Sequence, residues 1–372
     1  MMPARFSARL GLVQRVIPLY RAPFFEMLAG RCDGFSLFAG QPRPDEAIST
    51  ASILTTSSMD GHSAQLVQAH NLHFLTTSSP FYFCYQSGLT NWLENWNPVG
   101  LIFEANFRYL SSPAGVGWMK QRRRPVLGWG LGAPLDRGLL SGLRLRFLQK
   151  FDAIIAYSQR GAEQYADCGI PVDKIFVAPN AVASAPVQAL PQRANVFSPR
   201  PVLLFVGRLQ ARKRIPALLK ACALLPVTLH PRLIIVGDGP EADGLHALAK
   251  EIYPQTEFVG EKHGAELDEY FLASDLFVLP GTGGLAVQQA MSWGLPVIVA
   301  QGDGTQDDLV RAANGWQIPV GDDDALASTL REALSDVSRL REMGAESYRI
   351  VAQEINLEKM VDVFVNALNT VS

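Results

Sequence analysis

The sequence is poor in cysteine and has little imbalance between basic and acidic residues. Its 372 residues include four cysteines, and 33 Lys+Arg against 35 Asp+Glu give a net charge of -2. The cysteines are too sparse for a disulfide framework and are not spaced as metal-ligand pairs, so we expect free thiols in a reducing compartment. The near-neutral balance argues against a dedicated nucleic-acid-binding protein, because such proteins are usually strongly basic.

Long hydrophobic runs are also missing. No stretch approaches the ~18 consecutive apolar residues of a membrane-spanning helix. The first residues show no apolar segment followed by a small-residue cleavage site, so we predict no signal peptide and expect a cytoplasmic chain. Hydrophobic residues nevertheless make up 48% of the sequence, which excludes a disordered chain and is enough for packed cores.

The charges that are present are unevenly distributed. Residues 1–190 hold 17 basic and 12 acidic residues, whereas 191–372 hold 16 and 23. Within 120–150 there are eight basic residues and a single acid, mixed with leucine and phenylalanine towards the end. This pattern is typical of a solvated helix or of a segment that lies on an anionic membrane surface. Both interpretations stay open, and the second places the protein peripherally on the inner face of a membrane.

Short apolar runs alternate with helical patterns along the whole chain. The expected strands are 10–16, 35–40, 99–105, 125–132, 151–158, 174–180, 201–207, 232–239, 256–260, 275–280 and 295–300. Such alternation predicts βαβ units and parallel sheets. The proline-rich segment 184–200 has no periodicity and is the expected linker. We therefore predict an α/β protein with two doubly wound, Rossmann-like domains, 1–190 and 197–351.

Candidate ligand-binding residues follow several of the expected strands. In open α/β sheets ligands bind at the carboxyl ends of the strands. Arg208 and Lys213 follow 201–207 in an otherwise acidic half, and a glycine-rich turn at 281–284 follows 275–280. Cations and exposed backbone N–H groups at the start of a helix suit a diphosphate, although cations are also common at a solvated helix start. The sequence thus predicts anion binding at this edge.

Several motifs of the second half together resemble a known family. The sequences FVGRL…K, IIVGDGP, SDLFVLP and GLAVQQAMSWGLPVI (284–298) look like the donor half of a family 4 glycosyltransferase of GT-B fold. The resemblance covers about 197–350; the first half is similar more loosely, through DAIIAYS and KIFVAPNAV. It implies two Rossmann-like domains that face a cleft, and a final helix, 352–372, that packs back on the first domain. It also implies a nucleotide-diphosphate sugar as donor substrate, retention of configuration, and no metal or other cofactor.

The resemblance assigns roles to individual residues of the second half. Arg208 and Lys213 match the family's diphosphate-binding pair and are catalytic candidates. Gln289 and Gly281 stand where the family has the two acids of its Glu-x7-Glu motif. A glutamine can accept one hydrogen bond and donate another, so ribose binding survives in principle. The expected donor contacts are Gly207, Gly237, Gly260, Thr282, Gly283, Gly284, Leu285 and Gln289.

In the first half the candidates also follow expected strands. Tyr20 and Arg21 come after 10–16, and Glu104 and Asn106 come at and after the end of 99–105. We take Glu104 as a further catalytic candidate and Tyr20, Arg21 and Asn106 as acceptor or sugar contacts, although each can equally be structural. Asp303 is the remaining candidate contact. It follows the expected strand 295–300 and either touches sugar hydroxyls or caps the next helix.

These observations favour a glycosyltransferase of glycan or polysaccharide biosynthesis. The basic first half suits a phosphate-bearing or lipid-linked glycan as acceptor. Two alternatives remain. Gly281, Gln289 and Leu131, which stands where related sequences often have histidine, favour a non-catalytic protein that binds a sugar nucleotide or a partner. A sugar-nucleotide epimerase would need acid/base side chains, which are scarce at the expected strand ends.

Overall fold

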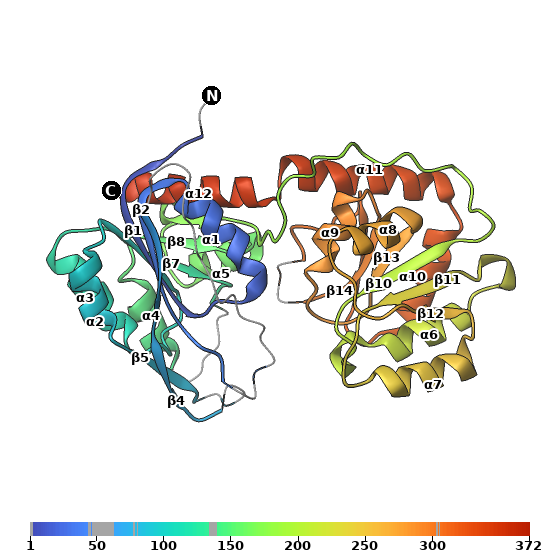
Figure 1. Ribbon diagram of the computed structural model, residues 1–372, viewed down its shortest axis with the longest axis horizontal. Helices are drawn as coiled ribbons and strands as arrows, with labels where there is room; N and C mark the ends of the chain where they lie inside the picture. Colours follow the sequence, from blue (N-terminus) through green and yellow to red (C-terminus); the bar gives the residue numbers. More distant parts are fainter. Residues whose placement is uncertain are drawn as a thin grey trace. The chain divides into compact units, whose positions relative to one another are not determined.

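The computed structural model describes residues 3–43, 46, 63–76, 79, 81–133, 140–302, 304 and 306–372. It forms two compact units, which we describe separately (Figure 1). Unit 1 comprises Met1–Val182 with Leu357–Ser372, and unit 2 comprises Ala183–Asn356. Unit 2 therefore begins just before the expected linker 184–200, and it ends a few residues after 351, the expected end of the second domain.

Unit 1 is built on a seven-stranded parallel sheet in the order β3-β2-β1-β6-β7-β8-β9. Its strands are β1 (Phe6–Val16), β2 (Cys32–Gly40), β3 (Ser63–Gln68), β6 (Gly100–Glu104), β7 (Val126–Gly130), β8 (Ala153–Ala156) and β9 (Ile175–Val177). Its helices are η1 (Leu19–Arg21), α1 (Ala22–Ala29), α2 (Leu89–Trp96), α3 (Ser112–Gln121), α4 (Ser141–Leu148), α5 (Gln159–Asp167), η2 (Val172–Lys174) and α12 (Leu357–Val371). The strand order reverses between β1 and β6, which makes their carboxyl ends the topological switch point of this sheet.

The sequence analysis missed three strands of unit 1. Besides β3 these are β4 (His70–Phe74) and β5 (Phe83–Ser87), which pair as an antiparallel hairpin. In β4 alternate residues are exposed, and in β5 Cys84 and Gln86 are buried between more exposed neighbours. Strands that bury only one face, and use asparagine, histidine, cysteine and glutamine on it, give no continuous apolar run.

Unit 2 repeats the arrangement with six parallel strands in the order β12-β11-β10-β13-β14-β15. These are β10 (Val202–Val206), β11 (Arg232–Val236), β12 (Thr256–Phe258), β13 (Leu276–Leu279), β14 (Val297–Ala300) and β15 (Gly315–Ile318). Its helices are η3 (Ala211–Lys213), α6 (Ile215–Ala223), η4 (Val227–Leu229), α7 (Ala242–Ile252), α8 (Ala265–Ala273), α9 (Ala286–Ser292), α10 (Asp323–Leu334) and α11 (Val337–Gln353). The two doubly wound sheets confirm the predicted fold class; β15 was missed because its Trp316 and Gln317 are only half-buried.

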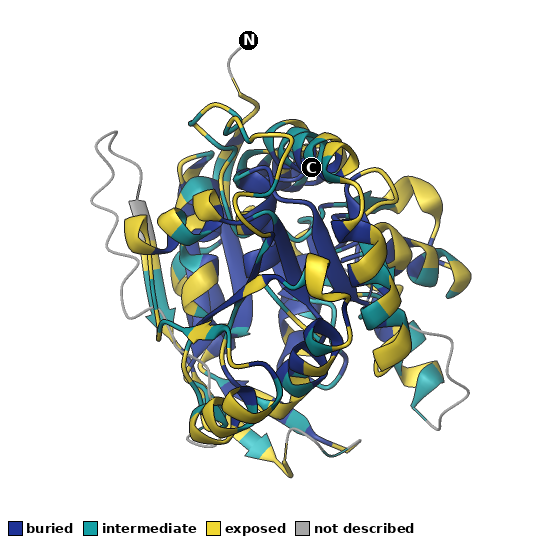
Figure 2. Ribbon diagram, turned by 90° about the vertical axis from the view of Figure 1, so that its right-hand side faces the viewer, coloured by how far each residue is buried: buried dark blue, intermediate teal, exposed yellow. Residues whose placement is uncertain are grey.

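The cores follow from the apolar strands. Parallel strands covered by helices on both faces read as near-continuous hydrophobic runs, and Leu203, Leu204 and Phe205 of β10 are fully buried. Figure 2 shows the central strands in dark blue, with much of the exposed yellow on helices and loops.

Helix α12 packs on unit 1, far from its neighbours in sequence. Its apolar residues recur with helical spacing, and Phe364 lies 4.8 Å from the ring centroid of Phe24 and 4.9 Å from that of Trp129. The cluster ties α12 to α1 and β7 through completely buried rings.

The segment 184–200, which the sequence suggested as a linker, is extended but anchored on unit 2. The Arg193 guanidinium donates to the carbonyls of Ser274 (3.1 Å), Phe271 (3.0 Å) and Trp293 (2.9 Å). Burial, with Arg341 nearby, lowers the pKa of Arg193 to about 10. The segment is therefore part of the unit 2 surface and not a free tether.

Candidate functional site

The switch point of the unit 2 sheet lies between β10 and β13. These strands pair in parallel, with Leu203 opposite Leu276 and Leu204 opposite Phe277. Because parallel neighbours end at the same edge, the loop that follows β10 and the loop that follows β13 meet there. The first loop contains Arg208 and ends with η3, and the second is the glycine-rich turn 281–284.

Lys213 joins these two loops. Its side chain is only 5% exposed, and its Nζ donates to the carbonyl oxygens of Thr282 (3.0 Å) and Gly283. The backbone N–H of Thr282 in turn donates to the carbonyl of Arg212 at 3.1 Å. Burial, with the charge of Arg212 beside it, lowers the pKa of Lys213 to about 8. Within the described part of the chain this ammonium group has no negatively charged partner, so the setting favours an anion.

Two glycines allow the close approach of the loops. A Cβ on Gly281 would lie 2.1 Å from the Arg212 carbonyl oxygen and 2.5 Å from the Lys213 Cα. A Cβ on Gly237 would lie 2.1 Å from the Gly207 carbonyl oxygen, and its φ of +136° also favours glycine. The lack of an acid at 281 therefore has a steric cause, since no side chain fits between this turn and η3.

The remaining donor candidates surround this edge. The N–H of Gly237 donates to the carbonyl of Gly260 at 2.8 Å, and the N–H of Gly207 donates to Val236 at 3.0 Å. These bonds hold the ends of β10, β11 and β12 together. Gly283 has a left-handed φ of +66°, and Leu285 is 38% exposed.

The cations after β10 differ in their surroundings. Arg208 is exposed and makes no hydrogen bond or ion pair with the residues that the structure describes. Arg212 donates from Nε to Gln210 Oε1 at 3.0 Å, and Arg214 pairs with Asp323 at 2.6 Å. Among the described residues, Arg208, Arg212 and Lys213 thus have no carboxylate partner, and a phosphate can supply a negative charge to this group.

Helix α9, which follows the glycine-rich turn, has only seven residues, Ala286–Ser292, and no side-chain cap at Leu285. So short a helix adds little dipole, and the cationic character of the edge comes from side chains. Gln289 is exposed on α9, whereas its neighbour Gln288 is buried and donates to the Ile355 carbonyl at 2.8 Å.

Unit 1 holds a second buried cation at its own switch point. Arg21 ends η1 after β1 and is 5% exposed. Its guanidinium carbon lies 5.0 Å from the Trp129 ring centroid, 5.1 Å from that of Tyr157 and 5.3 Å from that of Tyr20. Its Nη1 contacts Met360 Sδ at 3.8 Å. No ion pair of Arg21 occurs in the described part of the chain, so aromatic faces stabilise its charge.

Glu104 lies across the switch point from Arg21, at the end of β6. Its Oε1 accepts a hydrogen bond from the backbone N–H of Arg15 at 2.6 Å. Burial raises the pKa of Glu104, although this bond, the Arg15 charge and the Tyr109 hydroxyl act in the opposite direction. Arg15 also pairs with Glu46 at 2.8 Å, an interaction that the sequence analysis missed because the partners are far apart in sequence.

The other two candidates of unit 1 have different surroundings. The Asn106 side chain accepts a hydrogen bond from the Arg108 N–H at 3.1 Å and so stabilises its own turn. Tyr20 is 39% exposed and available to a ligand. Asp303 lies outside the described residues.

The second unit matches a known family. Residues 187–350 match the model described as "Glycosyl transferases group 1". The match covers most of unit 2 and no residue of unit 1. The chain is 26% identical over 302 residues to the lipopolysaccharide core biosynthesis glycosyltransferase LpsE of Rhizobium meliloti (strain 1021), which covers 74% of this chain and 87% of the relative. It is 35% identical over 147 residues to a GDP-mannose-dependent alpha-mannosyltransferase of Corynebacterium glutamicum, covering 39% of this chain and 34% of that protein.

Solved glycosyltransferase structures share the fold of the whole chain. HepE of Anabaena, in complex with UDP, superimposes with a TM-score of 0.69 at 18% identity, over 97% of this chain and 99% of HepE. The lipopolysaccharide outer core galactosyltransferase WaaB, in its apo form, gives a TM-score of 0.66 at 16% identity, over 97% of this chain and 99% of WaaB. The chain thus has the GT-B fold of glycosyltransferases.

The basic segment 120–150 of unit 1 is partly occupied by internal contacts. Lys120 pairs with Asp152, and the Arg122 guanidinium lies 3.8 Å from the Trp118 ring centroid. Arg123 and Arg146 are exposed, whereas 134–139 lie outside the described residues. Across the described residues, no helix is long and apolar enough to cross a membrane. The same residues include no group of three or more His, Cys, Asp or Glu side chains arranged to hold a metal ion.

Proposed function

We propose that this glycosyltransferase moves a sugar from a nucleotide-diphosphate donor to an acceptor hydroxyl, with retention of configuration and without a metal. The observation that carries the proposal is Lys213 at the switch point of unit 2. Among the described residues, its buried ammonium group bonds only to carbonyl oxygens. A buried cation without a carboxylate is poorly compensated, and a diphosphate would supply the missing charge.

The proposed chemistry needs little from protein carboxylates. The bond between the anomeric carbon and the diphosphate breaks, and a bond from the acceptor oxygen forms on the same face of the sugar. The acceptor proton passes to an oxygen of the departing diphosphate. Lys213 and the exposed Arg208 stabilise the charge that develops there, which is a preorganised electrostatic effect. This mechanism is compatible with a glycine at 281.

Unit 1 would supply the acceptor side. Arg21 offers a buried positive charge, Glu104 a carboxyl group with a raised pKa, and Tyr20 an exposed ring. The relatives named for lipopolysaccharide core and colanic acid biosynthesis support a growing bacterial glycan as acceptor. UDP in the HepE structure and GDP-mannose in the names of other relatives support a nucleotide sugar as donor.

A nucleotide screen followed by a transfer assay tests the proposal. Thermal unfolding in the presence of UDP, GDP and ADP identifies the base, because a ligand that binds the native state raises the melting temperature. The matching nucleotide sugars are then incubated with a lipopolysaccharide core oligosaccharide. Release of nucleoside diphosphate with transfer is expected; stabilisation by no nucleotide would overturn the proposal.

One observation favours a second candidate, a protein that binds a sugar nucleotide without transferring the sugar. The turn at 281 excludes any side chain that could contact the donor sugar from this position. The same assay separates the two functions, since nucleotide stabilisation without release or transfer would identify the non-catalytic protein.

We also propose a cytoplasmic location with peripheral membrane contact through 120–150. Arg123 and Arg146 are exposed, and Leu143 of α4 is 53% exposed, so a cationic surface with apolar residues is present. Co-sedimentation with vesicles tests this contact. Binding to phosphatidylglycerol vesicles that weakens in Arg123→Ala/Arg146→Ala is expected, and equal binding to neutral phosphatidylcholine vesicles would contradict it.

A further inference from the structure

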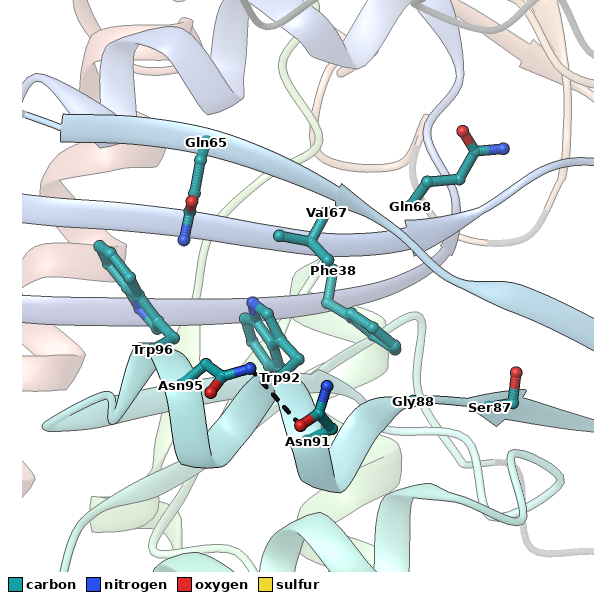
Figure 3. A pocket seen from close by; sticks show the side chains of 10 residues that line it. All are labelled: Phe38, Gln65, Val67, Gln68, Ser87, Gly88, Asn91, Trp92, Asn95 and Trp96. Carbon is teal, nitrogen blue, oxygen red and sulfur yellow. Dashed lines mark hydrogen bonds between the residues drawn. The ribbon is translucent and has the colours of Figure 1, made fainter.

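Unit 1 contains a pocket that the proposed reaction does not use. It measures about 450 Å³ and lies between β2, β3 and helix α2 (Figure 3). In the sheet order, β3 is the edge strand and is separated from β1 by β2. The pocket is therefore separate from the switch point of this unit, where Arg21 follows β1 and Glu104 ends β6.

Aromatic rings form one side of the pocket. Phe38 of β2 stacks on Trp92 of α2 with ring centroids 5.1 Å apart, and Trp96 lies one helical turn further. The indole N–H of Trp92 donates to Ser36 Oγ at 2.9 Å, and that of Trp96 donates to the Leu10 carbonyl at 3.1 Å. Both indoles are thereby fixed in orientation before any ligand arrives, which lowers the entropic cost of binding.

Amide side chains surround the aromatic rings. Gln65 of β3 points toward α2, while Gln68 points to the other face of the strand (Figure 3). Asn91 and Asn95 lie on the same face of α2, because residues four apart are neighbours on a helix. The amide nitrogen of Asn95 lies 3.5 Å from Asn91 Oδ1, at the limit of a hydrogen bond. The side chains of Gln65, Asn91 and Asn95 are all exposed, so their amide groups can form further hydrogen bonds with a ligand.

None of the described residues that line the pocket carries a formal charge. Besides the aromatic and amide residues it contains Val67, Ser87 and Gly88. One cation lies nearby, since the Arg9 guanidinium is 5.8 Å from the Trp96 ring centroid, but Arg9 does not line the pocket. A phosphate or carboxylate would find no paired charge among the lining residues, so a neutral ligand is favoured.

We propose that this pocket binds a neutral saccharide unit. A pyranose has an apolar C–H face, which suits a fixed indole ring, and a rim of hydroxyls that donate and accept hydrogen bonds. A carboxamide also does both, so Gln65, Asn91 and Asn95 can pair with neighbouring hydroxyls. The proposal goes beyond the proposed transfer reaction: it adds a second contact with a glycan chain on unit 1, which would raise the effective concentration of an acceptor.

Calorimetric titration of the full chain tests the pocket. The probes are methyl α-D-mannopyranoside, methyl α-D-glucopyranoside, N-acetylglucosamine and maltose. We expect at least one of them to bind, and the double substitution Gln65→Ala/Asn91→Ala to weaken it about tenfold or more, because each removes a hydrogen bond worth about 1 kcal/mol. Gln121→Ala, an exposed amide at the end of α3 outside the pocket, is the matched control and should bind as the wild type does.

Further variants separate this site from the donor site. Trp96→Phe keeps an aromatic ring but loses the bond to Leu10 and part of the ring surface, so it should retain the fold and bind the saccharide more weakly. Lys213→Ala and saturating nucleoside diphosphate should both leave saccharide binding unchanged. The proposal is overturned if no probe binds, if the amide substitutions leave the affinity unaltered, or if Lys213→Ala abolishes binding. These readouts do not depend on transferase activity, so they remain decisive if no transfer is found.

Discussion

The two units place a buried cation at corresponding points of similar sheets, but they stabilise it differently. Lys213 follows β10 and Arg21 follows β1, each at the end of a 3-10 helix and each 5% exposed. Carbonyl oxygens surround the ammonium group of Lys213, whereas aromatic rings and a thioether surround the guanidinium of Arg21.

This difference indicates different roles. Carbonyl partners can be exchanged for phosphate oxygens, so Lys213 fits a site that is filled and emptied in each turnover. A guanidinium held by ring faces keeps its donor groups available while its position is fixed, which suits recognition of one substrate group. We therefore propose donor chemistry for Lys213 and acceptor recognition for Arg21, and the following predictions test that division.

The largest expected effect is the loss of Lys213. Lys213→Ala should lower kcat roughly 10²–10³-fold, as removal of one preorganised charge-stabilising group does in other enzymes. Lys213→Arg should retain part of the activity because it keeps the charge. Lys220→Ala, an exposed lysine on α6, is the control and should turn over normally. Equal activity of Lys213→Ala and Lys220→Ala in a nucleotide-release assay would remove Lys213 from the mechanism.

Arg21 should have a smaller and more selective effect. Arg21→Met fills the aromatic cage without charge, so we expect a folded protein whose kcat/KM for the acceptor falls about tenfold to a hundredfold. Donor affinity, measured by titration with the nucleoside diphosphate, should stay unchanged. If Arg21→Met lowered the donor affinity as well as kcat/KM for the acceptor, both cations would act on the same substrate. The division between a donor role for Lys213 and an acceptor role for Arg21 would then be wrong.

The pH dependence of donor binding gives a third test. Lys213 has its pKa lowered to about 8, and a bound diphosphate would raise it again. Above about pH 8, Lys213 must therefore take up a proton when the diphosphate binds. The Kd of the diphosphate should then increase by up to tenfold per pH unit, whereas below about pH 8 it should not depend on pH. Lys213→Arg, which stays protonated, should abolish this slope. An identical pH profile for both proteins would place the titrating group elsewhere.

The smallest effects concern the helix caps of the two units. Ser158 is fully buried and caps α5 by accepting from the Gly161 N–H at 3.0 Å; Asp322 caps α10 by accepting from the Ala325 N–H at 2.8 Å and is exposed. Each substitution to alanine should lower the free energy of unfolding by about 1 kcal/mol, with the larger loss at the buried serine. Denaturant unfolding of both variants measures this; a larger loss for Asp322→Ala would contradict the expectation.

The sequence predicted the features that short apolar runs and local charge encode. The strands β10, β11 and β13 stand out because they are buried on both faces, and Lys213 stands out as a cation in an acidic half. The hairpin β4–β5 was missed because only one of its faces is buried. The cage around Arg21 was not predictable, since Trp129 lies on β7, Tyr157 directly follows β8, and both meet Arg21 only after the sheet has formed. The steric reason for Gly281 likewise exists only once η3 lies against the turn.

The return of the chain to unit 1 affects the order of events during synthesis. Ribosomes release domains in sequence order, and a domain usually folds once its residues have emerged. Unit 1 cannot complete its cluster of Phe24, Trp129 and Phe364 until α12 is made, after all of unit 2. Unit 2 is made later but is continuous in sequence, so it can finish folding before unit 1 does. Until α12 has emerged, the apolar surface of unit 1 that this helix covers stays accessible to chaperones.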